Sequence, residues 1–156
     1  MIQRKQSLYL LAAFVLSVAC LCLPLGAFVP AGMGKGITLF NLALTGGPTG
    51  WHFTSSPLSV LLALSALLSL FTIFRYKNRR QQLKLCTLNI VVLVAWYLSY
   101  GVIIHLILPG TEPFKGMAFR VGFATCLPLV AFLCVLLARK GVKDDERLVK
   151  AADRIR

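Results

Sequence analysis

Five cysteines are the side chains of this sequence best suited to redox chemistry: Cys20, Cys22, Cys86, Cys126 and Cys134. Four-span thiol oxidases that pass electrons to a quinone need cysteine pairs in or beside loops that substrate thiols can reach. None of the five lies in such a loop of the layout predicted below, and Cys20 and Cys22 point about 200° apart on a helix. The sequence therefore favours packing roles for the cysteines, and a quinone-linked thiol oxidase stays as the third hypothesis.

Histidines and the polar residues of one apolar segment are the next candidates for chemistry. His52 and His105 are too few ligands for a zinc site without a cysteine or carboxylate at a ligand spacing. The polar residues along residues 86–108 include Asn89, Tyr97, Tyr100 and His105. Polar groups of this kind can line a cleft for a small molecule within a membrane. A transporter or small pore is therefore the second hypothesis.

Composition and patterning indicate a membrane protein. Of the 156 residues, 58% are hydrophobic and 14% are charged, and the charges lie between long apolar runs. A helix needs roughly 20 apolar residues to cross a bilayer core of about 30 Å. Four runs approach this length and predict spans at residues 8–29, 58–74, 86–108 and 117–138. Arg120, one turn inside the last of them, must then reach back to the interface.

The predicted fold class is an all-α membrane protein. Residues 1–140 form an antiparallel bundle of four transmembrane helices with a structured outer loop at residues 30–56, and residues 141–156 form a short cytoplasmic C-terminal helix. The outer loop is rich in glycine and too long for a simple connector. Within it, residues 37–44 could form a short strand or hairpin arm.

Basic residues predict the orientation. Fourteen of the 17 Lys and Arg residues lie before the first span, between the second and third, or after the fourth. Lys35, Lys115 and Arg120 are the other three. Because loops rich in Lys and Arg stay in the cytoplasm, we expect a multi-pass protein of the bacterial inner membrane with both termini in the cytoplasm. The net charge of +12 then reflects topology, and no nucleic-acid partner is expected.

The C-terminal tail supplies the candidate binding residues. Three acidic residues, 144–146, lie near its start and four basic residues lie after them, at positions 147, 150, 154 and 156, which matches the helix dipole. An apolar stripe runs along it at helical spacing. A solvated helix that only fixes topology is the alternative. We predict that six residues contact a partner, the charges setting orientation and the apolar pair docking: Arg147, Leu148, Lys150, Asp153, Arg154 and Ile155.

Both ends of the chain resemble a known family. Residues 1–10 (MIQRKQSLYL) and 143–156 (KDDERLVKAADRIR) are similar to the two ends of a family of small four-span membrane proteins of Bacteroidota-type bacteria, known as domain of unknown function number four-two-nine-three. The resemblance implies a four-helix integral membrane protein and brings no activity with it. It directs attention to Gln3, Arg4 and Gln6, which we expect to meet the tail helix at the membrane face.

The leading hypothesis is a noncatalytic subunit or scaffold of a membrane assembly. Its expected partners are the lipid bilayer and a membrane or cytoplasmic protein that binds the tail. No catalytic residue, cofactor or metal is expected, because the sequence has no phosphate-binding glycine loop and no Ser, His and acid set.

Overall fold

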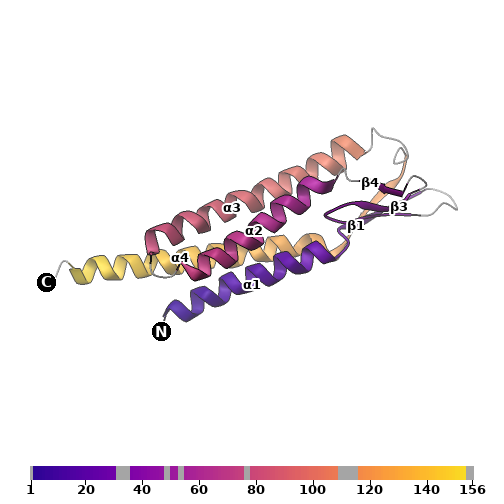
Figure 1. Ribbon diagram of the computed structural model, residues 1–156. Coiled ribbons are helices and arrows are strands. Elements are labelled where there is room, and N and C mark those ends of the chain that lie inside the picture. The colour runs from indigo at the N-terminus through magenta and orange to yellow at the C-terminus, as the bar shows by residue number, and fades with distance from the viewer. Residues whose placement is uncertain are drawn as a thin grey trace.

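Four long helices make up most of the computed structural model, which describes residues 2–30, 36–47, 50–52, 55–75, 78–108 and 116–153. The helices are α1 (Ile2–Cys22), α2 (Ser56–Phe74), α3 (Arg79–Val102) and α4 (Leu127–Asp153). Consecutive helices run in opposite directions (Figure 1), and α1 and α3 each pack against both α2 and α4. A π-helical turn, Ile103–Ile107, continues α3, and a 3-10 turn, Phe123–Cys126, precedes α4.

A small antiparallel sheet lies at one end of the helices. Its strands are β1 (Gly26–Val29), β2 (Ile37–Leu39), β3 (Leu44–Gly47), β4 (Gly50–His52) and β5 (Ala118–Val121). Their spatial order is β4-β3-β2-β1-β5, so β1 pairs with a strand from the far end of the chain. We call this end of the molecule the sheet end. The opposite end, where both termini lie (Figure 1), is the terminal end.

The sheet corrects the all-α prediction and moves the sheet-end boundary of two predicted helices. The first helix ends at Cys22 instead of running to residue 29, because Pro24 has no N–H to donate and the next residues pair as β1. At the predicted start of the fourth span, residues 118–121 form β5, so Arg120 lies in a strand opposite Ala27 and not inside a helix. The expectation of a strand or hairpin arm at residues 37–44 is confirmed in part by β2 and the start of β3.

Two other predicted boundaries also move. The third helix begins at Arg79 rather than residue 86, where the Asn78 side chain accepts a hydrogen bond from the N–H of Gln81. The prediction of a separate tail helix after residue 140 is wrong, since α4 continues without a break to Asp153. The reason is that the packed face of α4 continues past this point, with Ala138 and Val142 both buried.

The four helices turn apolar side chains outward and small polar ones inward. On α2, Val60, Leu64 and Leu67 are all exposed and share one face, whereas Ser65 and Ser69 are buried. Water-soluble domains rarely expose so much contiguous apolar surface. In the described residues, three helical segments are long and apolar enough to cross a membrane, Ser56–Phe74, Arg79–His105 and Phe123–Leu148, and Gln6–Cys22 is a shorter apolar helix.

Candidate functional site

The C-terminal part of α4 contains the residues that the sequence predicts for partner binding. Figure 1 shows that this end of α4 extends beyond the other three helices at the terminal end. Arg147 and Leu148 are exposed there, and the Leu148 side chain is 60% exposed. At Lys150 and Asp153 the structure describes the helical backbone only. The last two predicted residues, Arg154 and Ile155, lie outside the described residues.

A buried hydrogen-bonded junction holds the base of this projecting segment. The Gln6 side-chain amide of α1 donates to the Asp145 carboxylate of α4 over 2.7 Å. The Arg79 guanidinium, at the start of α3, donates to the Asp145 backbone carbonyl over 3.0 Å. Gln6 and Asp145 are only 5% and 8% exposed. Three helices are therefore tied together at one residue of α4, immediately before the helix leaves the packed region.

Close approach of α1 and α4 at the junction depends on a glycine. A Cβ atom on Gly141 would lie 3.0 Å from Cγ and 3.3 Å from Nε2 of Gln6, so a side chain there would crowd the amide that bonds Asp145. The expected meeting of the N-terminal segment with the tail is confirmed for Gln6. The side chains of Gln3 and Arg4 are outside the described part of the chain.

Asp145 is a junction residue that the sequence analysis missed, since its charge was assigned to the helix dipole. A signal for it does exist. Ala138, Val142 and Asp145 follow the i, i+4, i+7 spacing of one helix face, and all three are buried. Had the apolar face of the fourth span been extended past residue 140, Asp145 would have been predicted as a buried carboxylate in need of a partner.

A cavity of about 360 Å³ lies between the end of α3 and the sheet. The Tyr100 side chain and His105 of the π-helical turn line it, together with β1 and β5 residues. The Tyr100 hydroxyl oxygen is buried and has no hydrogen-bond partner among the described residues. Its ring stacks on Trp96 with centroids 5.4 Å apart, and this stacking restricts the side chain that lines the cavity.

The predicted polar cleft of the third span is not a single site. Tyr100 and His105 share the sheet-end cavity, but the Tyr97 hydroxyl donates to the backbone carbonyl of Thr125 over 2.7 Å. Asn89 lies nearer the middle of α3, where its amide accepts from Ser65 and donates to Ser69 over 2.6 and 2.7 Å. These bonds join α2 to α3 in the way that small polar residues join membrane helices.

Asn41, between β2 and β3, connects the sheet to the helices. Its side-chain amide donates to the Cys20 backbone carbonyl over 2.7 Å, and its side-chain oxygen accepts from the Trp96 indole N–H over 3.2 Å. Asn41 is fully buried. Sequence analysis missed this residue, because an Asn in a glycine-rich loop is the usual signal of an exposed turn.

The cysteines occupy separate environments in the structure. Cys20 and Cys86 are buried and Cys22 and Cys126 are exposed, all with free thiols. The Cys20 thiol donates to the Ala124 backbone carbonyl over 3.3 Å, which joins α1 to the 3-10 turn before α4. This contact favours the packing role that the sequence indicates for Cys20.

One family comparison is decisive. The family described as "Domain of unknown function (DUF4293)" matches residues 2–155. The chain belongs to the DUF4293 family. The match runs through both ends of the chain and so confirms the resemblance seen in the sequence. A comparison with curated proteins found no match. The DUF4293 description names no activity, so the roles of residues in this member follow from its geometry.

Proposed function

We propose that this protein is a noncatalytic subunit or scaffold that crosses a bacterial inner membrane four times, with both termini in the cytoplasm. Outward-facing apolar side chains on all four helices support membrane insertion. The apolar part of α1, Gln6–Cys22, reaches about 25 Å at a rise of about 1.5 Å per residue, a little less than the bilayer core of about 30 Å. The excess of Lys and Arg near the terminal end supports its cytoplasmic location.

The projecting end of α4 is the proposed docking site for a protein partner. One observation supports it most strongly: α4 remains helical past the buried junction at Asp145, and Leu148 is left 60% exposed beyond it. Arg147 is exposed beside it, and the predicted tail residues add further basic charge. A helix of this kind fits a partner groove with an apolar floor and an acidic rim. The contacts at Asp145 hold the helix in place before binding, which lowers the entropy lost on docking.

Removing the two described docking residues should weaken recovery of the partner by about tenfold or more, because burying a leucine side chain at an interface contributes about 1.5–3 kcal/mol. The protein is extracted from its native membrane in mild detergent through an affinity tag in the outer loop. The Arg147→Ala/Leu148→Ala variant is compared with the intact chain. We expect a stoichiometric partner with the intact chain and loss of it with the variant.

Lys140→Ala is the control for this purification, since Lys140 is exposed on the same helix but precedes the junction. It should recover the partner as well as the intact chain does. Equal amounts of all three proteins in the membrane fraction would show that insertion is unaffected. An intact chain that purifies alone, or a partner that survives the double substitution, would contradict the docking proposal.

A small-molecule transporter or pore is the second candidate, favoured by the sheet-end cavity and by the unpartnered hydroxyl of Tyr100, one of the residues that line it. The ligand would be an uncharged, largely apolar molecule with a hydrogen-bond acceptor, because Phe28, Ile104 and Phe119 make most of the wall apolar.

Under this candidate, Tyr100→Phe should slow uptake by reconstituted protein about two- to tenfold, the value of one hydrogen bond. Tyr97→Phe is the matched control, as the Tyr97 hydroxyl is bonded to the backbone of Thr125. Equal rates for the two variants would exclude a role for Tyr100.

A further inference from the structure

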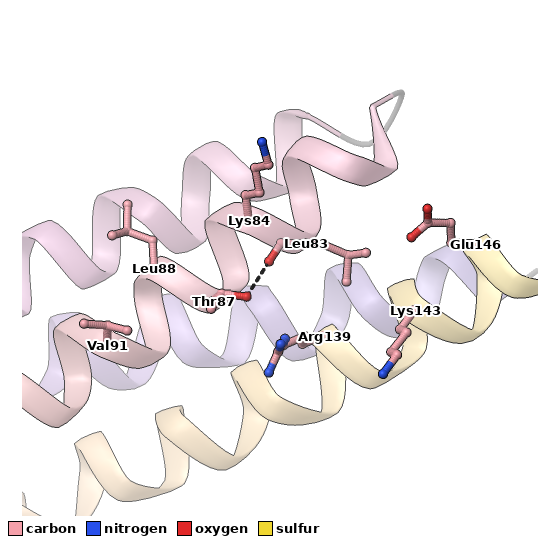
Figure 2. Close-up of a pocket in the computed structure, with 8 residues that line it drawn as sticks. All are labelled: Leu83, Lys84, Thr87, Leu88, Val91, Arg139, Lys143 and Glu146. Carbon is pink, nitrogen blue, oxygen red and sulfur yellow. Dashed lines mark hydrogen bonds between the residues drawn. The ribbon is translucent and has the colours of Figure 1, made fainter.

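A groove of about 550 Å³ runs between α3 and α4 toward the terminal end. Figure 2 shows that its walls come from these two helices alone, with Leu83, Lys84, Thr87, Leu88 and Val91 from α3 and Arg139, Lys143 and Glu146 from α4. Two kinds of surface share this groove. An apolar part lies toward the middle of the helices, and a charged part lies toward the terminal end.

The apolar part of the groove is open to the surroundings. Leu88 is 49% exposed and Val91 is 58% exposed. The Thr87 hydroxyl donates to the Leu83 backbone carbonyl over 2.8 Å (Figure 2), so it offers no free donor to a ligand. Leu88 and Val91 are one turn apart and belong to the outward-facing apolar surface of α3. This part of the groove suits a hydrocarbon chain.

The charged part has an excess of cations. Lys84, Arg139 and Lys143 are all exposed, and Glu146 is the one carboxylate that lines the groove with them. Arg139 and Lys143 are four residues apart on α4, a spacing at which like charges repel each other. An anion bound between them would offset this repulsion. Lys84 and Val91 are separated by about 10 Å along α3, so the cations lie a short distance beyond the apolar part.

We propose that this groove is a binding site for an anionic phospholipid of the cytoplasmic leaflet. The phosphate lies between Arg139 and Lys143 of α4, with Lys84 of α3 on the opposite wall of the groove, and one acyl chain lies along Leu88 and Val91. Basic pockets between transmembrane helices at the cytoplasmic side are suited to anionic headgroups. The inference rests on the membrane orientation proposed above and adds a lipid ligand, distinct from the protein partner on the projecting end of α4.

The first test asks whether the unmodified protein binds an anionic lipid more tightly than a zwitterionic one. Purified full-length protein in detergent is titrated with phosphatidylglycerol or with phosphatidylethanolamine of the same acyl chains, and bound lipid is counted by native mass spectrometry. Each basic side chain near an anionic surface contributes about a fivefold change in affinity, so we expect phosphatidylglycerol to bind at least about tenfold more tightly. Inorganic phosphate should not displace it, since phosphate lacks the chain that Leu88 and Val91 contact. Displacement by phosphate would overturn the lipid assignment in favour of a simple anion site.

Substitution of the groove cations is the second test. The triple variant Lys84→Gln/Arg139→Gln/Lys143→Gln should abolish the preference for phosphatidylglycerol. A control triple, Arg75→Gln/Arg80→Gln/Lys140→Gln, removes the same charge from exposed residues that do not line the groove, and it should keep the preference. The proposal would be overturned if both triple variants lost the preference for phosphatidylglycerol equally. Equal binding of the two lipids by the unmodified protein would also overturn it.

Failure of this proposal is distinguishable from failure of the proposed function. A protein that inserts into membranes and recovers its partner, yet shows no lipid preference, would contradict the groove alone. A protein that fails to enter lipid nanodiscs would contradict the membrane assignment itself. Circular dichroism of both triple variants checks that the helices persist, and the lipid titration of the unmodified protein needs no variant.

Discussion

Replacing Gly122 with alanine should lower the free energy of unfolding by about 3 kcal/mol, the upper end of the usual range for overpacking. A Cβ atom at Gly122 would lie 2.8 Å from the Leu25 carbonyl oxygen and 2.9 Å from the Pro24 carbonyl oxygen. Both are backbone atoms, so no side chain can turn aside to relieve the contact. The Gly122 N–H also donates to the Leu25 carbonyl over 2.7 Å. An alanine side chain would therefore push residue 122, before α4, away from residues 24–25, after α1, and weaken the contact between these helices at the sheet end.

Gly101→Ala is the matched control for this substitution. A Cβ atom on Gly101, within α3, would meet nothing within 4 Å. Alanine there should be neutral or raise stability by about 0.5–1 kcal/mol, since glycine lowers helix stability. Reversible unfolding in mixed micelles, followed by circular dichroism, gives both values. Equal midpoints for the two variants would show that Gly122 has more room than the structure gives it.

Replacing Asn41 with alanine should lower the free energy of unfolding by about 2–4 kcal/mol, because unpaired buried polar groups cost about 1–3 kcal/mol each. The substitution leaves the Trp96 indole N–H and the Cys20 carbonyl without the bonds that Asn41 makes to them. Trp96 is fully buried, so water cannot replace the lost acceptor freely. Unfolding in micelles, monitored by tryptophan fluorescence, measures the loss.

Two comparisons make the Asn41 prediction specific. Leu42→Ala, at the next position, should change stability little, because Leu42 is 52% exposed. In a Trp96→Phe background, which has no indole donor, Asn41→Ala should cost about 1 kcal/mol less, the coupling expected of two bonded side chains. An unchanged cost in that background would contradict the hydrogen bond between Asn41 and Trp96.

The positions of the helices and the direction in which each one runs could be predicted from the sequence, because each depends on a local pattern. Helix α2 was predicted at residues 58–74 and is observed at Ser56–Phe74, with Pro57 near its start where proline fits a helix. The split of basic residues predicted that both termini share one end of the molecule, and Figure 1 shows them there. Apolar runs and charge counts are sufficient for features of this kind.

Contacts between distant segments could not be predicted in this way. Strand β1 pairs with β5, which places Gly26 opposite Val121, and nothing near either residue indicates the other. A short apolar run such as residues 26–29 has the same pattern in a buried strand as in the end of a membrane helix. Asn41 was missed for the same reason, since its partners Cys20 and Trp96 belong to α1 and α3.

The buried carboxylate at the terminal end shows where a charge pattern misleads. Asp144 and Asp145 are neighbours in a run of acidic residues, yet Asp144 is exposed and Asp145 is 8% exposed and bonded to Gln6. Their shared charge predicted one role for both. Their surroundings differ because successive side chains point about 100° apart around a helix. Asp145 therefore faces the other helices while Asp144 faces outward.

The central claim is that a protein partner docks on the projecting end of α4, and photocrosslinking tests it most directly. A photoreactive amino acid replaces Leu148 in the full-length chain, in cells, and irradiation precedes lysis. The control places the same group at Leu133, which is 51% exposed on the same helix and faces lipid in the proposed membrane arrangement. We predict one discrete protein adduct at position 148 that is absent at position 133. No protein adduct at position 148, or the same adducts at both positions, would contradict the claim.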